Sequence, residues 1–222
     1  MVVVLSLLAG PALAHPVPVD TSASCPASTP NAGFADIGTL DATTRTAINC
    51  LAAFGIAQGT TAETYSPNAN VARWQMALLL IRQAEDHGLS VPAPIDQGFT
   101  DISGQAAATR DAINQVAQMG ISSGTTSTTF SPNEIVTRSQ MALFLYRLAV
   151  RAGVTVTDDP TSDSFSDIGA YGSEIQNAIT FLADGHIALG TSEGIFSGNI
   201  NVTRWQMALF ITRVLAADGI TQ

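Results

Sequence analysis

Lysine is absent from the 222-residue chain, and all nine basic residues are arginines. The acidic residues outnumber them and give a formal net charge of −9. Charged residues make up only 12% of the chain, so charge of either sign is sparse. A chain with so few basic residues lacks the positively charged surface that binds phosphates or anionic lipids. We therefore expect neither nucleic acid nor a membrane surface as a partner.

Histidine is also scarce, and the three histidines lie without the spacing of a metal site. The aspartates near residue 160 lack the ligand spacing and the turn glycine of a calcium loop. The chain contains no nucleophile elbow, phosphate-binding loop or recognisable Ser-His-Asp arrangement. These absences predict no metal, no cofactor and no enzymatic activity.

Only two cysteines are present, Cys25 and Cys50. In an oxidising compartment they could form a disulfide that fastens the N-terminal segment to the first helix. The alternative is two unpaired thiols. A lipid anchor on Cys25 is disfavoured, because Ser22 stands where the lipidation signal requires a leucine.

No apolar run is long enough to span a bilayer. Residues 1–14 have a short apolar core, a Gly-Pro breaker and a small-x-small site at Ala12-Leu13-Ala14, which is typical of a cleaved export signal. The alternative is a buried N-terminal helix. Residues 15–33 are rich in Pro, Ser, Thr and Ala and predict a flexible arm. We expect a secreted protein with no membrane association after cleavage.

Three repeated units follow, over residues 34–88, 99–153 and 165–222. They begin with Phe-x-Asp-Ile, the aspartates being Asp36, Asp101 and Asp167. Each continues into a helix with apolar residues at i, i+3 and i+4, which ends at a glycine: Gly55, Gly120 or Gly185. The aspartates are expected to fix a turn before this helix.

A second helix closes each unit and opens with Arg73, Arg138 or Arg204. Thr137 with Gln140, and Thr203 with Gln206, form capping boxes, whereas Ala72 removes the cap in the first unit. The cap places the arginine at the first helical position, beside backbone N–H donors that favour anions.

A unit of two helices cannot bury its apolar faces alone, so the three units should pack on one another. We predict an all-α protein with three tandem helical repeats arranged as a three-lobed domain around a pseudo-threefold axis. The alternative is a linear solenoid of helical hairpins.

On these residues the chain resembles the S-layer homology family, whose pattern combines Phe-x-Asp, an Ala-Ile helix, Gly-Ile-x-x-Gly, an aromatic six residues later and a Thr-Arg-Ala-Glu helix start. The resemblance covers residues 34–222. It implies an exported helical domain that holds proteins on the bacterial cell wall by binding a wall-linked glycan. It also implies that the motif arginine contacts an anionic, often pyruvylated, sugar in grooves between lobes. By motif position the arginines are Arg73, Arg138 and Arg204.

The chain departs from the family pattern where the motif has Ala-Glu. These pairs are Trp74-Gln75, Ser139-Gln140 and Trp205-Gln206. Glutamine in place of glutamate removes a negative charge near each arginine and makes the site more receptive to an anion. The two tryptophans could stack on sugar rings or pack between lobes.

Each of these candidates has a structural alternative. The three arginines could instead form internal salt bridges to Asp36, Asp101 and Asp167. A second set, Arg82, Arg147 and Arg213, is expected to serve structure through a helix end or an ion pair between lobes. Among the candidate ligands we rank Arg138 first, because its unit keeps both the cap and the turn proline.

The function predicted from the sequence is a non-catalytic cell-surface anchor that binds an anionic cell-wall polysaccharide. The second hypothesis is a structural surface-layer protein that self-associates or binds partner proteins without a glycan.

Overall fold

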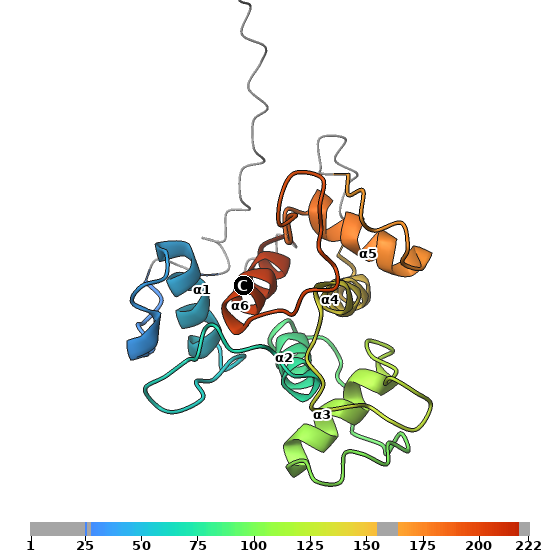
Figure 1. The fold of residues 1–222 in the computed structure, drawn as a ribbon. Helices are drawn as coiled ribbons and strands as arrows, with labels where there is room; N and C mark the ends of the chain where they lie inside the picture. Colours follow the sequence, from blue (N-terminus) through green and yellow to red (C-terminus); the bar gives the residue numbers. More distant parts are fainter. Residues whose placement is uncertain (1–24, 26–27, 155–163, 218–222) are drawn as a thin grey trace, which may run out of the picture.

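The computed structural model describes residue 25, residues 28–154 and residues 164–217. The expected signal, residues 1–14, and most of the arm lie outside the described residues. The described chain is all-α (Figure 1). Its elements are the 3-10 helix Ala35–Ile37 and the α-helices α1 (Ala42–Ala53), α2 (Arg73–Asp86), α3 (Ala107–Gln118), α4 (Arg138–Ala152), α5 (Ser173–Asp184) and α6 (Arg204–Ala217). Within these ranges, none of the helices has the length and apolarity needed to cross a bilayer.

The aspartate that opens each unit fixes the turn that precedes the second helix, and not a turn before the first helix as expected from the sequence. The Asp36 carboxylate accepts the backbone N–H groups of Tyr65 and Ser66 at 2.8 and 2.7 Å. Asp101 and Asp167 hold the equivalent residues of their own units in the same way. The turn serine is left-handed in every unit, with φ near 57° at Ser66. Such a conformation is unfavourable for an L-residue, so the two carboxylate contacts stabilise a backbone that would otherwise relax.

Helices pair between units rather than within them. The second helix of one unit packs on the first helix of the next, giving the pairs α2–α3 and α4–α5. The helix α6 packs on α1, which brings the last unit against the first. Figure 1 shows α2, α4 and α6 at the centre, with α1, α3 and α5 outside them. An open linear solenoid would leave the first and last units apart.

The backbone segments before the central helices meet in a closed ring of hydrogen bonds. Val136 donates to Val71, Val202 donates to Val136, and Val71 donates to Val202, each over 2.9 Å. All three side chains are buried. This cycle of contacts supports the pseudo-threefold arrangement expected from the sequence.

The starts of the central helices dock on the turn of a neighbouring unit. The Arg138 N–H donates to Ile200 O and the Ser139 N–H to Gly198 O, both at 2.9 Å. The starts of α2 and α6 make the equivalent bonds to the turns of the second and first units. The expectation that these donors are available to an anion is therefore wrong, because carbonyl oxygens already occupy them.

The caps of these helices differ as the sequence predicts, with one exception. Gln140 Oε1 accepts the Thr137 N–H at 3.1 Å, and Thr137 Oγ1 accepts the Gln140 N–H at 3.4 Å, which completes the capping box of α4. Gln206 accepts the Thr203 N–H, but Thr203 Oγ1 is buried without a partner, so this box is half formed. Ala72 has no side-chain acceptor, although Gln75 still caps its N–H.

The N-terminal arm is fastened to α1. Cys25 and Cys50 form a disulfide with their Cα atoms 5.5 Å apart. The Ala32 N–H donates to Asn49 Oδ1, and the Gln97 N–H donates to Asn114 Oδ1 at the equivalent place on α3. The end of the arm and the linker before the second unit therefore lie along their helices in the same manner.

The first helix of the third unit ends with its glycine in a different position from that in the other two units. The left-handed residue after α1 and α3 is Gly55 or Gly120, whereas after α5 it is His186, with φ 51°. Gly185 has a right-handed backbone and is the C-cap itself. The helix stops at Gly185 as predicted, but the left-handed residue that Gly55 and Gly120 supply in the other units is His186 here.

Candidate functional site

The motif arginines of the three units make equivalent hydrogen bonds. Each guanidinium Nε donates to the carbonyl oxygen of the turn aromatic in another unit: Arg73 to Phe130 at 2.8 Å, Arg138 to Phe196 at 3.0 Å and Arg204 to Tyr65 at 2.8 Å. Each Nη2 makes a further bond to the loop of the contacted unit, at Ser122 Oγ, Leu189 O and Gln58 O respectively. The arginines thus join neighbouring units through charge-assisted bonds.

Aromatic rings enclose two of these arginines on both sides. The guanidinium carbon of Arg138 lies 4.6 Å from the centroid of the Phe196 ring and 5.7 Å from that of Phe210. Arg73 lies similarly between Phe130 and Phe144. Cation–π attraction and the carbonyl bonds offset the cost of burying the charge. Both arginines are only 3% exposed.

Arg204 has an aromatic ring on one side, that of Tyr65 at 4.4 Å. The position equivalent to Phe144 and Phe210 is Leu79, which is itself only half-buried. Arg204 is half-buried as well. The shorter Leu79 therefore leaves open the side of the arginine that phenylalanine covers in the other two units.

A pocket of about 360 Å³ lies at this open side. We call it the Arg204 pocket; it lies between α2, the loop after α1 and the start of α6. Its lining residues are Ala57, Gln58, Gly59, Thr60, Trp74, Gln75, Leu78, Leu79, Arg82 and Arg204. A void of about 10 Å³ lies behind it and is also bounded by Leu79 and Arg204. Leu79 thus borders both the pocket and the void, as Arg204 does.

The Arg204 pocket carries two guanidinium groups and, among the described residues that line it, no carboxylate. Arg82 Nη1 donates to Ile56 O at 3.3 Å, which holds that side chain against the loop. Trp74 supplies an aromatic wall and Gln75 supplies an amide whose Oε1 is engaged in capping α2. Two cations beside an indole ring form a surface suited to a carboxylate carried on a sugar.

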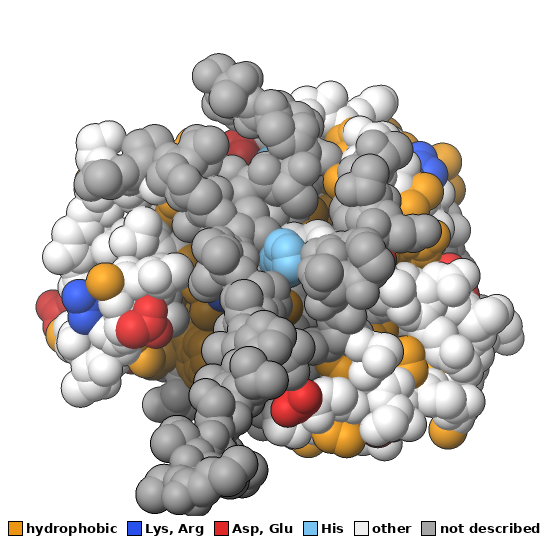
Figure 2. All heavy atoms as spheres, turned by 90° about the horizontal axis from the view of Figure 1, so that it is seen from above, with side chains coloured by type: hydrophobic (Ala, Val, Ile, Leu, Met, Phe, Trp, Pro, Cys, Tyr) orange, Lys and Arg blue, Asp and Glu red, His pale blue; other side chains and the backbone are white. Residues whose placement is uncertain are grey.

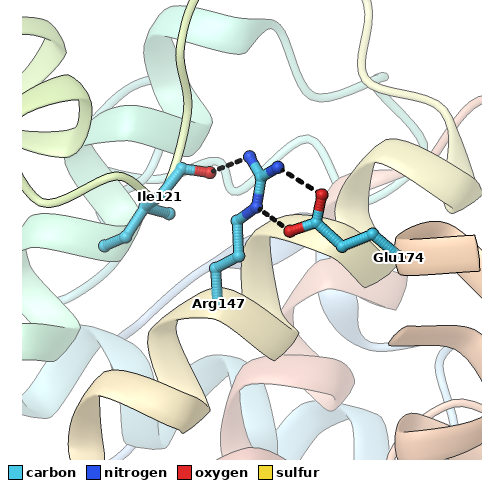
Figure 3. A network of polar contacts seen from close by, with 3 residues as sticks. All are labelled: Ile121, Arg147 and Glu174. Atoms are coloured by element: carbon cyan, nitrogen blue, oxygen red, sulfur yellow. Dashed lines mark hydrogen bonds and ion pairs between the residues drawn. The ribbon is translucent and has the colours of Figure 1, made fainter. Parts of the chain in front are cut away.

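Arg147 of the second unit, which corresponds to Arg82, has its charge neutralised by a carboxylate. Arg147 forms a bidentate ion pair with Glu174 of α5, with both N···O distances 2.8 Å, and its Nη1 also donates to Ile121 O (Figure 3). The hydrogen bond from Arg147 lowers the pKa of Glu174. This is the ion pair between lobes that the sequence suggested for this set of arginines.

The third unit has equivalents of more of the residues that line the Arg204 pocket than the second unit has. It has Trp205, Gln206 and Arg213 where the first has Trp74, Gln75 and Arg82. Arg213 Nη1 donates to Ile187 O at 3.2 Å, and burial lowers its pKa. One difference lies at Phe210, which is 5% exposed and covers Arg138.

Burial lowers the pKa of Arg73 and Arg138, while the nearby carboxylates of Glu134 and Asp101, or of Asp167, act in the opposite direction. The aspartates nevertheless use their oxygens on the turn N–H groups. Burial would raise the pKa of Asp167, but the N–H groups of Phe196 and Ser197 outweigh it and keep the pKa low. Turn carbonyls, rather than the aspartates, are the direct acceptors for the arginines.

A second hollow, of about 520 Å³, adjoins the Arg204 pocket through Ala57, Gln58 and Gly59. Its other walls come from the end of α1, from Phe34, Thr61 and Ala62, and from residues 30–32 of the N-terminal arm. The disulfide holds this arm in place. The first unit therefore has a longer depression than the Arg204 pocket alone.

Of the site residues predicted from the sequence, the structure brings Arg204, Trp74 and Gln75 into one pocket. Arg73 and Arg138 are buried, and Gln140 and Gln206 are caps. Trp205 packs partly against the core, as Trp74 also does. The sequence interpretation gave no ligand role to Arg82 and did not consider Leu79, although the difference between Leu79 and the two phenylalanines was visible.

On the face shown in Figure 2, charged side chains are few and scattered among uncharged ones. No group of three His, Cys, Asp or Glu side chains that could hold a metal lies within the described part of the chain.

Two segments, residues 33–77 and 98–142, match the S-layer homology domain. A similar known protein is an endoglucanase from Bacillus sp. (strain KSM-635), 29% identical over 158 residues. The alignment covers 71% of this chain and 16% of the endoglucanase, so the chain spans a small part of that protein's length. S-layer homology domains are non-catalytic modules that anchor proteins to the cell wall. These two segments are therefore S-layer homology domains.

Proposed function

We propose that this chain is a non-catalytic, secreted cell-surface anchoring module that binds an anionic cell-wall polysaccharide. The observation that carries the proposal is the Arg204 pocket, where Arg82 and Arg204 lie beside Trp74 without a lining carboxylate. The polymer would present a carboxylate-bearing sugar, such as a pyruvylated hexose, to the two guanidinium groups. A guanidinium fork recognises a carboxylate better than a hydroxyl because it donates two parallel hydrogen bonds.

The third unit is part of the same module in this proposal. It has the same helices, the same aspartate-held turn and the same arginine bond to a turn carbonyl as the other two. It also supplies Arg204 to the pocket that the first unit lines. The disulfide between Cys25 and Cys50 agrees with export to an oxidising compartment.

The adjoining hollow extends the proposed site. Its residues include Asn31, Gln58 and Thr61, which carry neutral polar side chains suited to sugar hydroxyls. A polysaccharide bound with its anionic sugar at Arg204 could continue into this hollow.

Co-sedimentation with purified cell-wall sacculi tests the proposal. Wild-type protein should pellet with intact sacculi and remain soluble after acid extraction of the wall polymers. Arg204→Ala should lose binding, whereas Arg151→Ala, which removes an exposed arginine of α4, should retain it. Unchanged binding by Arg204→Ala at an unchanged melting temperature would refute the site. Equal pelleting before and after extraction, or self-pelleting without sacculi, would favour the structural surface-layer alternative.

A further inference from the structure

We infer that the residue six positions after each motif arginine decides which of the three related grooves accepts a sugar, and that wild-type protein accepts one only at Arg204. This inference rests on the proposed function for the identity of the ligand, but its structural part can be tested without any sugar. The three deciding residues are Leu79, Phe144 and Phe210.

The deciding residue lies against the motif arginine of another unit. Phe144 on α4 covers Arg73, and Phe210 on α6 covers Arg138, with ring-to-guanidinium distances of 5.6 and 5.7 Å. Leu79 on α2 occupies the same place beside Arg204. The exposed fraction of each arginine depends on whether leucine or phenylalanine lies beside it. The two arginines covered by phenylalanine are 3% exposed, and Arg204 is half-buried.

Leu79 borders the Arg204 pocket of about 360 Å³, so the room for a larger side chain lies on the pocket side of the leucine. The small void of about 10 Å³ is bounded by Leu79, Tyr65 and Arg204, and the Arg204 pocket opens on the other side of the same leucine. A phenylalanine ring at position 79 would extend into this space and cover the guanidinium, as it does in the other units. Leu79 is therefore a specificity-determining residue that admits the carboxylate of the ligand.

The third groove differs from the open one at few of these positions. Trp205, Gln206 and Arg213 are already present there, so replacing Phe210 by leucine should convert it into a second site. The second groove differs further. It has the buried Ser139 in place of a tryptophan, and Glu174 already neutralises its Arg147. Replacing Phe144 should uncover Arg73 without creating a sugar site.

The first experiment measures arginine accessibility by modification with p-hydroxyphenylglyoxal, followed by mass spectrometry of the peptides. In wild-type protein Arg204 should react at least tenfold faster than Arg73 and Arg138, with exposed Arg151 as the internal reference. Leu79→Phe should slow the reaction of Arg204 at least tenfold. Phe210→Leu and Phe144→Leu should accelerate Arg138 and Arg73, respectively. Equal rates for the three arginines in wild type, or an unchanged rate in all three variants, would overturn the inference.

The second experiment counts sites by calorimetric titration with a methyl glycoside of a 4,6-pyruvylated hexose and with a methyl hexuronide. Wild type and Phe144→Leu should bind one sugar, Phe210→Leu two, and Leu79→Phe at least tenfold more weakly than wild type. Two or three equal sites in wild type would overturn the inference. If Leu79→Phe does not fold, the two phenylalanine variants still decide it.

The two experiments distinguish failure of the inferred role of Leu79, Phe144 and Phe210 from failure of the proposed function. If the labelling follows the expected pattern but neither sugar binds, these residues control access to the arginines and the proposed ligand is wrong. If a sugar binds wild-type protein but Leu79→Phe leaves both labelling and affinity unchanged, the proposed function stands and Leu79 does not control access.

Discussion

Arg204 and Arg138 occupy equivalent positions and make equivalent bonds, yet they have different surroundings. Arg138 lies between two phenylalanine rings and is buried, whereas Arg204 lies on one tyrosine ring and lines a pocket. The hydrogen bonds to the turn carbonyl and the neighbouring loop are common to both, so they explain how units are joined but not how a ligand is bound. One side chain, Leu79 or Phe210, separates a structural arginine from one that can bind.

The second set of arginines also contains one member that is available to a ligand and one that serves structure. Arg82 and Arg147 both donate to the carbonyl of an isoleucine in their own unit. Arg147 also pairs with Glu174, whereas Arg82 faces the Arg204 pocket. The position on α3 equivalent to Glu174 on α5 is Ala108, which carries no charge. The first unit therefore keeps positive charge where the second has cancelled it.

The largest effect that this comparison predicts is on stability. Arg138→Ala leaves a cavity between two rings and two carbonyl oxygens without donors, so it should destabilise the protein by about 3–5 kcal/mol. Arg204→Ala, at a half-buried position, should cost about 1–2 kcal/mol. Urea unfolding of both variants measures the difference. Equal losses would show that the second phenylalanine ring contributes nothing to the structural role.

Removing the disulfide should have the next largest effect. Its two cysteines are 25 residues apart, and closing a loop of this size contributes about 3.5 kcal/mol in the chain-entropy account. Because the arm lines the hollow beside the Arg204 pocket, Cys25→Ser with Cys50→Ser should also weaken binding to the wall polymer. Urea unfolding and sacculus co-sedimentation measure the two effects separately. A stability loss without any change in binding would remove the arm from the proposed site.

The third prediction concerns binding at the open site. Arg204→Ala removes a charge-assisted contact that we expect to contribute about 1.5–3 kcal/mol, which corresponds to about tenfold to a hundredfold in affinity. This replaces the ranking drawn from the caps, which placed Arg138 first. A buried arginine cannot contact a polymer, however well its helix is capped. Affinity for acid-extracted wall polymer, measured at matched folded fraction, should fall for Arg204→Ala and not for Arg151→Ala.

The repeats and the helices follow from the sequence because they depend on spacing within one unit. The aspartates act at a different place from the one expected, because each holds the turn before the second helix of its unit and not a turn before the first. Phe-x-Asp lies about thirty residues before the turn that it holds, and the same spacing recurs three times. His186 shows the limit of this reasoning. The conspicuous Gly185 suggested a familiar helix end, but the core positions Ile113 and Ile179 set the register and place His186 at the left-handed residue.

The exposure of the arginines could not be predicted in the same way, because it depends on contacts between units. Arg138 meets Phe196 and Phe210 across 58 residues and 72 residues of chain, respectively. The apolar faces of one unit indicate that the units pack on one another, but not which helix of the next unit each helix meets. The useful signal was the difference among copies at positions 79, 144 and 210, which acquires a meaning only when the units are assembled.

The smallest expected effect is the loss of stability when the ion pair between Arg147 and Glu174 is removed. Glu174→Gln removes one charge of an exposed pair, for which the loss of stability at neutral pH should be below about 1 kcal/mol. Because the folded state lowers the pKa of Glu174, the pair stabilises the protein above the ordinary glutamate pKa of about 4.3, and this contribution disappears as the pH falls through the lowered value. Wild type and variant should therefore differ at pH 7 and become equal near pH 3 in urea unfolding, and added salt should narrow the gap. A gap that persists at pH 3 would mean that Glu174 acts through packing. Binding at the Arg204 pocket should be unaffected throughout, since Glu174 pairs with an arginine of a different groove.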